Sequence, residues 1–189
     1  NYLGTGQVYG PFDFYTGLSD TELLDPYRKH AKQSRRRAYG SFGYETDGGT
    51  TYRLDFNYVR NEEHLPGALT FQEYKDNPRQ ANPSSVEFDE GRFYDYYRVA
   101  FSVRTPIGTD QALEFLTQFN IQNMDHPLSF AVIDNDTYNV GAEVRYLYNT
   151  NIGGMLNNLV MGAQFFYTYQ QDLNWANDFG KRGEKTKDQ

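Results

Sequence analysis

Apolar and polar residues alternate along much of the chain, and a helical period of 3.6 residues is almost absent. The clearest window is residues 51–61, where every second position is apolar and the positions between are mostly polar. Its apolar set is Tyr52, Leu54, Phe56 and Tyr58, and its polar set is Arg53, Asp55 and Asn57. Successive side chains of a strand point to opposite faces of a sheet. The pattern therefore predicts a sheet with one apolar face and one polar face.

The same alternation recurs in about eight segments of roughly 10–14 residues each. Strands of soluble proteins usually have about 5–6 residues, whereas a tilted strand that crosses a bilayer needs about 9–11. The connections at 46–49, 105–109 and 149–156 are short, and those at 25–34, 62–92 and 125–136 are longer and polar. Connections that alternate in this way are typical of outer-membrane barrels. The sequence thus predicts an all-β, antiparallel, up-and-down transmembrane β-barrel segment over residues 1–189.

Composition excludes several other classes of protein. With 38% hydrophobic residues and a mean hydropathy of -0.79, the chain is too polar for a helical membrane protein. Its 17% aromatic content excludes a disordered chain. A net charge of -7 argues against nucleic-acid binding, and the lack of cysteine removes disulfides and thiol chemistry. No nucleophile elbow, phosphate-binding loop or paired-carboxylate motif is recognisable, so we expect no enzyme.

Tyrosines gather near the expected strand ends, where an outer-membrane barrel carries its aromatic girdles. The alternative interpretation is ordinary β-propensity, because Tyr and Phe are favoured in any sheet. Long strands and unequal connections favour the girdle.

The expected connections contain three further features. Thr70 and Glu73 have the spacing of a capping box, which predicts a short helix near 71–76 inside the long loop 62–92. Residues 28–37 hold six of the 18 Lys and Arg residues, a cluster that could attract anionic chelates or lipopolysaccharide phosphates, or simply be a solvated loop. The three histidines, His30, His64 and His126, are far apart in the sequence and lack metal-ligand spacing, so we expect no metal site.

Strand parity assigns side chains to the two faces. If the long loops face outward from the cell, the lumen near the outer rim carries Arg35, Arg37, Tyr94, Tyr96, Arg98, Asn120 and Gln122. Glu114, Glu143 and Arg145 also point into the lumen, where we expect a lattice of ion pairs. The opposite parity, which includes Leu54, Phe56, Phe101 and Phe119, is expected to face hydrocarbon.

Several loop segments resemble a known family. They are residues 65–70 (LPGALT), 76–83 (DNPRQANP), 25–30 (DPYRKH), 36–40 (RRAYG), 126–127 (HP), 132–134 (VID) and 180–183 (GKRG). In this order they resemble TonB-dependent outer-membrane receptors, in the branch of the ferric-siderophore and ferric-citrate transporters. The match covers most of the chain.

The resemblance implies a barrel of about 22 strands with a plugged lumen in the bacterial outer membrane. It implies active transport of a ferric siderophore or a similar anionic metal chelate, energised through TonB. The partners would be outer-membrane lipid and lipopolysaccharide, the chelate, and the TonB complex acting through a plug domain. No plug domain, energy-coupling box or C-terminal aromatic strand is recognisable here, so we expect about eight strands of the larger barrel.

The resemblance makes six lumen residues candidates for contact with the chelate: Arg35, Arg37, Tyr94, Tyr96, Arg98 and Gln122. Arginine would supply charge, and tyrosine a ring face and a hydroxyl. Two alternatives remain open from the sequence. One is a small eight-stranded outer-membrane barrel with a structural or adhesion role. The other is a soluble ligand-carrying β-barrel whose apolar face points inward.

Overall fold

A single antiparallel sheet of nine strands forms the body of the protein in the computed structural model, which describes residues 1–188. The strands are β1 (Tyr2–Tyr9), β2 (Phe12–Leu23), β3 (Gln33–Glu45), β4 (Thr51–His64), β5 (Gly91–Pro106), β6 (Gln111–Leu128), β7 (Ala131–Ile152), β8 (Met155–Asp178) and β9 (Lys181–Asp188). Two short helices, α1 (Phe71–Asp76) and α2 (Pro83–Glu87), lie between β4 and β5. Among the described residues, neither helix has the length and apolar character needed to cross a membrane.

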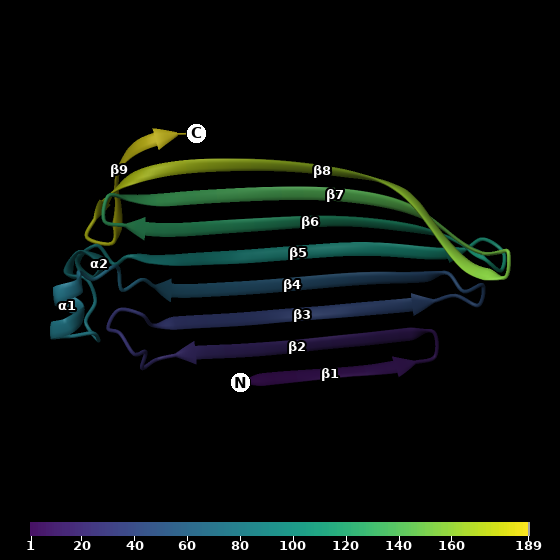
Figure 1. Cartoon of the computed structure of the whole chain (residues 1–189), viewed down its shortest axis with the longest axis horizontal. Helices are drawn as coiled ribbons and strands as arrows, with labels where there is room; N and C mark the ends of the chain where they lie inside the picture. Colours follow the sequence, from purple (N-terminus) through teal and green to yellow (C-terminus); the bar gives the residue numbers. More distant parts are fainter. Residues whose placement is uncertain (189) are drawn as a thin grey trace.

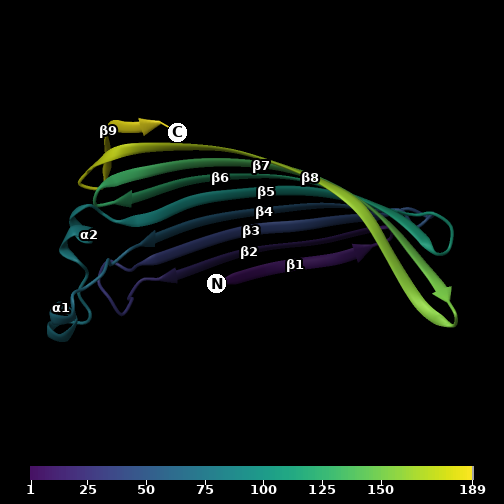
Figure 2. The ribbon, with the colours of Figure 1, turned by 45° about the horizontal axis from the view of Figure 1, so that its top comes forward.

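Each strand pairs with its neighbours in the sequence, so the spatial order is β1 to β9 (Figure 1). The connections of residues 24–32 and 65–90, with both helices, lie at one end of the sheet, which we call the loop end. The tight turns after β1, β3, β5 and β7 lie at the other end, the turn end. The sheet is curved (Figure 2) and open, because β1 and β9 are not paired within residues 1–188. This is not the arrangement of a closed eight-stranded barrel.

The register keeps the alternating apolar and polar side chains of the strands on opposite faces of the sheet, as the sequence predicts. One continuous row across six strands is Phe42, Leu54, Phe101, Thr117, Ala142 and Phe165. The expected hydrocarbon-facing side chains Leu54, Phe56, Phe101 and Phe119 are 44%, 36%, 37% and 45% exposed. They therefore lie side by side on an open apolar face and do not meet in a dry interior.

Rows of tyrosine border this apolar face. Towards the loop end the row is Tyr58, Tyr97, Ile121, Tyr138 and Tyr169. Towards the turn end, Phe12, Tyr44 and Tyr52 lie side by side on β2, β3 and β4. The next row towards the loop end, beyond that of Tyr58, is polar although it lies on the same face. It consists of Arg60, Asp95, Asn123 and Asp136. The apolar side chains thus form a band with aromatic edges, and the strands continue past it.

Strand length differs from the sequence-based expectation, whereas the number of strands roughly agrees with it. Residues 1–188 form nine strands of 8 to 24 residues, and about eight of roughly 10–14 were expected. The expected long loop at 125–136 is wrong, because β6 and β7 stay paired as far as Leu128 and Ala131 and only Ser129 and Phe130 form the turn. In this segment apolar residues 131–133 and polar residues 134–136 follow one another in blocks, so the alternation that marks a strand disappears from the sequence.

The long connection is shorter than expected. It covers residues 65–90, because β4 continues to His64 and β5 begins at Gly91. Helix α1 occupies the range given by the capping box, in which the Thr70 hydroxyl accepts from the Glu73 amide and the Glu73 carboxylate accepts from the Thr70 amide. Helix α2 was not expected. It begins after Asn82, whose side chain accepts from the Ser84 amide.

On the polar face near the turn end, an ion pair crosses over a glycine. Arg53 of β4 donates from Nη2 to Oδ1 of Asp13 on β2 at 2.9 Å, although β3 lies between the two strands. The residue of β3 beneath this contact is Gly43. A Cβ atom at this position would lie 1.9 Å from Asp13 Oδ2 and 2.8 Å from Arg53 Nη2. The ion pair therefore requires glycine at position 43.

We expect Gly43→Ala to destabilise the protein by about 1–3 kcal/mol, because the added methyl group overpacks the site and separates Arg53 from Asp13. Urea unfolding in detergent micelles, followed by tryptophan fluorescence, measures the change. Gly48→Ala is the matched control, because the nearest atom to a Cβ there is Thr46 Oγ1 at 3.9 Å. Equal midpoints for the two variants would contradict this account of Gly43.

Candidate functional site

The six candidate ligand residues lie on the polar face near the loop end, in three successive rows. In the first row Arg35 and Tyr94 flank Asn61. The second contains Arg37, Val59, Tyr96 and Gln122, and the third contains Tyr39, Asn57, Arg98 and Asn120. The register thus brings together residues that are up to 87 positions apart in the sequence, from β3, β5 and β6.

Cationic side chains of these rows are largely without counter-charges. Arg35 donates from Nε to Asn61 Oδ1 at 2.9 Å. Within the described part of the chain, Arg37 and Arg98 have neither an ion pair nor a side-chain hydrogen bond. The only carboxylate in these three rows between β2 and β8 is Asp172, five strands away from Arg35 on β8. This part of the polar face therefore has a net positive charge that an anion could neutralise.

Nearer the turn end, the same face is charged but balanced. Glu143 pairs with Arg145 on the same strand, and Arg104 Nε lies 3.6 Å from Glu114 Oε1. Of the expected lattice of Glu114, Glu143 and Arg145, the pair of Glu143 with Arg145 is present, whereas Glu114 pairs with Arg104. Arg53 and Asp13 form a further, separate pair on this face, and neither this pair nor Arg104 was expected from the sequence. Because acids and bases alternate there, the unpaired arginines near the loop end are a local feature and not a property of the whole face.

Buried asparagines lie among the candidate residues. Asn61 is 4% exposed and accepts the hydrogen bond from Arg35. Asn120 is 9% exposed, stands beside Arg98 in the ladder, and its buried Oδ1 has no hydrogen-bond partner. Buried polar atoms are nearly always satisfied in folded proteins. Asn120 Oδ1 is therefore an unsatisfied buried acceptor next to Arg98.

Three tyrosines that the sequence analysis missed lie on the polar face close to these rows. Tyr2, Tyr15 and Tyr39 come from β1, β2 and β3, and their hydroxyl groups are hydrogen-bonded to one another. Gly4 and Gly6 of β1 and Gly17 of β2 leave room on this face for large rings from neighbouring positions, but in the sequence they do not show which rings meet.

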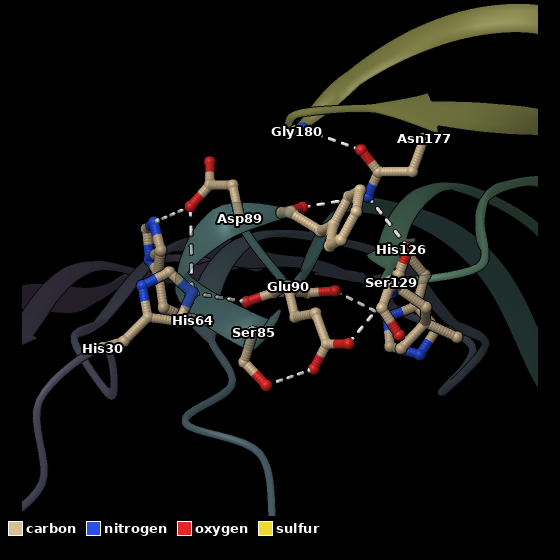
Figure 3. Close-up of polar contacts among 12 residues, drawn as sticks. His30, His64, Ser85, Asp89, Glu90, His126, Ser129, Asn177 and Gly180 are labelled. Atoms are coloured by element: carbon tan, nitrogen blue, oxygen red, sulfur yellow. Dashed lines mark hydrogen bonds and ion pairs between the residues drawn. The ribbon is translucent and has the colours of Figure 1, made fainter. Parts of the chain in front are cut away.

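At the loop end, two histidines that are distant in the sequence come into contact (Figure 3). The ring centroids of His30 and His64 are 5.0 Å apart, and Asp89 Oδ1 lies 3.8 Å and 3.5 Å from their Nε2 atoms. The two histidines meet although they are far apart in the sequence, because the His64 amide donates to the Lys32 carbonyl and joins the two connections. Among residues 1–188, no three or more His, Cys, Asp or Glu side chains are arranged to hold a metal ion.

Glu90 ties the long connection to the turn between β6 and β7 (Figure 3). Its carboxylate accepts from Ser85 Oγ at 2.6 Å and from the Ser129 amide at 2.9 Å. Partial burial acts to raise the pKa of Glu90, but these hydrogen bonds outweigh it and lower the pKa below its usual value. Asn177, near the end of β8, joins the same contact, because its Nδ2 donates to the Phe88 carbonyl of the long connection and to the Leu128 carbonyl at the end of β6.

In the cationic segment 28–37, Arg28 helps to hold the long connection in place. Arg28 donates to three carbonyl groups of the long connection, those of Pro66, Gly67 and Gln80, at 2.9–3.1 Å. Arg36 lies on the opposite face from the candidate residues, within 3.7 Å of Asp20 and 3.9 Å of Glu22. Of this segment, Arg35 and Arg37 alone are candidate ligand residues.

No family model and no curated protein matches the sequence. Two solved structures share its fold. The ferric citrate transporter FecA in the unliganded form superposes with a TM-score of 0.82 over 99% of this chain, at 14% identity. The siderophore receptor PiuA from Acinetobacter baumannii superposes with a TM-score of 0.70 over 92% of this chain, at 10% identity. The chain has the fold of a receptor-barrel segment.

The resemblance to TonB-dependent receptors noted in the sequence is thereby confirmed at the level of the fold. The chain covers 29% of the FecA chain and 28% of the PiuA chain, so it spans less than a third of either protein. These two proteins are a transporter and a receptor, not enzymes.

Acidification should loosen the packing of the two loop-end connections. Burial, together with the nearby charge of His30, lowers the pKa of His64, and Asp89 only partly opposes this. The folded loops therefore hold the neutral ring, and their packing loses stability as the pH falls below about 6.5, the ordinary histidine pKa. Lys32 and Glu62 are the other charged groups that act on this ring.

Hydrogen–deuterium exchange of segments 25–34 and 62–66, compared at pH 7.5 and 5.5 after correction for intrinsic rates, tests this expectation. Protection should fall at the lower pH, and His64→Gln should remove most of that dependence. Protection that is independent of pH in the unsubstituted protein would contradict the assignment to His64.

Proposed function

We propose that this chain forms part of the wall of an outer-membrane receptor barrel that takes up an anionic ferric chelate. The observation that carries the proposal is the set of arginines on the polar face near the loop end. Arg35, Arg37 and Arg98 lie there without carboxylate partners, in rows that also hold tyrosine and amide side chains. FecA and PiuA, which share the fold, are a ferric citrate transporter and a siderophore receptor, and this supports the choice of ligand class.

In the proposed mechanism, the polar face lines an aqueous lumen and the loop end faces the outside of the cell. Guanidinium groups pair with carboxylates in a planar, bidentate geometry. Arg37 and Arg98 would hold the carboxylates of a chelate, while Tyr94, Tyr96 and Gln122 add hydroxyl and amide hydrogen bonds. Release towards the periplasm would be energised by the TonB complex through a plug domain, which is not among the residues described here.

The apolar band supports placement in a membrane. On β7 and β8 its side chains run from the tyrosine row at Tyr138 and Tyr169 to Tyr148 and Leu159. These segments, residues 138–148 and 159–169, have eleven residues each, close to the 9–11 that a tilted transmembrane strand needs. The polar rows beyond it, with Arg60, Asp95 and Asp136, would stand at the level of lipopolysaccharide head groups. Further strands, to a total of about 22, would close the barrel by pairing with its open edges.

We expect Arg37→Gln and Arg98→Gln each to raise the Kd for ferric citrate roughly tenfold, because each removes a charge-assisted hydrogen bond of about 1.5–3 kcal/mol. Equilibrium binding of radiolabelled ferric citrate to the protein in detergent measures the effect. Arg36→Gln is the control, since Arg36 belongs to the same segment but lies on the opposite face near Asp20 and Glu22. Equal affinities in all three variants and the parent would overturn the proposal.

The membrane-facing direction of the sheet can be tested at two adjacent positions of β8. Phe165 lies on the apolar face, in the middle rows of the band, and Gln164 lies on the polar face beside Glu143. In lipid vesicles Phe165→Arg should lower the free energy of unfolding by about 2–4 kcal/mol, because arginine is costly at the bilayer midplane. Gln164→Arg should change it by less than about 1 kcal/mol. The reverse order would place the apolar face away from lipid.

A further inference from the structure

Three phenol groups converge at one point of the polar face, beside the first strand. Tyr2 and Tyr39 bring their hydroxyl oxygens to 2.8 Å, and Tyr39 and Tyr15 bring theirs to 3.1 Å. The hydroxyls of Tyr2 and Tyr15 are in hydrogen-bond contact as well. Three oxygen atoms from three strands thus form one small triangle, which we call the tyrosine triad.

The neighbouring strands make room for this triangle with glycine. The ring of Tyr39 lies over Gly17, where a Cβ atom would come within 2.6 Å of the Tyr39 hydroxyl. A Cβ atom at Gly4 would lie 2.3 Å from the Tyr2 hydroxyl, and one at Gly6 would lie 2.9 Å from the Tyr15 ring. Side chains at these three positions would therefore push the hydroxyls apart. The triad is a built feature of β1, β2 and β3 and not a chance meeting of long side chains.

The geometry of the triad fits an octahedral cation. Oxygen ligands at about 2.0–2.1 Å from such an ion lie roughly 2.9 Å from their neighbours, close to the separations of 2.8 Å and 3.1 Å seen here. Phenolate is a hard, anionic oxygen ligand, and hard ligands prefer hard cations. Tyrosine holds ferric haem iron in catalase, which shows that the phenolate of a protein is a competent ligand for Fe³⁺.

We propose that Tyr2, Tyr15 and Tyr39 bind a ferric ion through their three phenolate oxygens. Each phenol gives up its proton when its oxygen bonds to iron, so binding releases three protons, and the charges of Fe³⁺ and three phenolates cancel. No electron is transferred. The inference deepens the proposed function, on which it rests for the presence of ferric iron at this face.

The other three coordination positions of the ion would point away from the strands, towards water or the donor groups of a chelate. Arg37 lies in the same row as Tyr2, separated from it by Ser19. A carboxylate bound to the ion could therefore reach a guanidinium group two strands away. The triad and Arg37 together select a chelate that leaves part of the ferric coordination shell open, as opposed to one that encloses the metal.

Titration of the protein in detergent with ferric nitrilotriacetate at pH 7.5 tests the inference. Binding should produce a visible phenolate-to-iron charge-transfer band that saturates at one ferric ion per chain. Tyr15→Phe should reduce the band at least tenfold at the same iron concentration. Tyr97→Phe, on the apolar face, is the matched control and should leave the band unchanged.

A second variant keeps all three phenols. Gly17→Ala should displace the Tyr39 hydroxyl and weaken the band by a similar factor, whereas Gly48→Ala should not. Far-UV circular dichroism and heat-modifiable migration in a gel establish that each variant is folded. Absence of the band in the parent protein, or an equal band in folded Tyr15→Phe, would overturn the inference.

The two proposals fail in different ways. If the band is absent while ferric citrate binding still depends on Arg37 and Arg98, the triad is not an iron site and the receptor proposal stands. If the band appears while the arginine variants bind ferric citrate as the parent does, the iron site stands and the receptor proposal falls.

Discussion

The antiparallel register is the constraint on which the rest of the structure depends. Because side chains alternate between faces with a period of two, the pairing of the strands decides which residues meet. A slip of one residue between β3 and β4 would move Arg35 and Arg37 out of the rows of Tyr94 and Tyr96. The same slip would carry Leu54 and Phe56 to the polar side. The apolar band, the arginine rows and the tyrosine triad are therefore consequences of one hydrogen-bonded ladder.

The chain is acidic overall, yet the polar face near the loop end is cationic. This contrast arises because the acidic groups are placed elsewhere. Asp20 and Glu22 lie beside Arg36 on the face opposite the candidate residues. Glu114 and Glu143 balance arginines on the polar face near the turn end. The positive charge is thus a property of a few rows, and the net charge of -7 gives no indication of it.

Strand parity was enough to predict that Arg37, Tyr96 and Gln122 share a face, whereas their placement in one row depends on the register. Where β6 and β7 leave the apolar band, apolar and polar residues no longer alternate, and parity gives no information. For this reason the paired ends of β6 and β7 were mistaken for a loop at 125–136.

Contacts between loops, such as that of His30 with His64, depend on the path of the backbone between them. No periodic pattern in the sequence records that path. The tyrosine triad lay beyond prediction for a related reason. Its three residues have no common spacing, and they meet only because the register sets Gly17 beside Tyr39 and Gly6 beside Tyr15.

The long connection at the loop end is held from several sides, by Arg28 on one flank and by Ser129 and Asn177 on another. Its two helices are capped, and the hydrogen bonds from its neighbours leave it little freedom to swing on its own. A loop that is already ordered has little conformational entropy to lose when a ligand arrives. In the proposed receptor, capture of a ligand at this rim would therefore resemble the docking of a solute against a preformed wall.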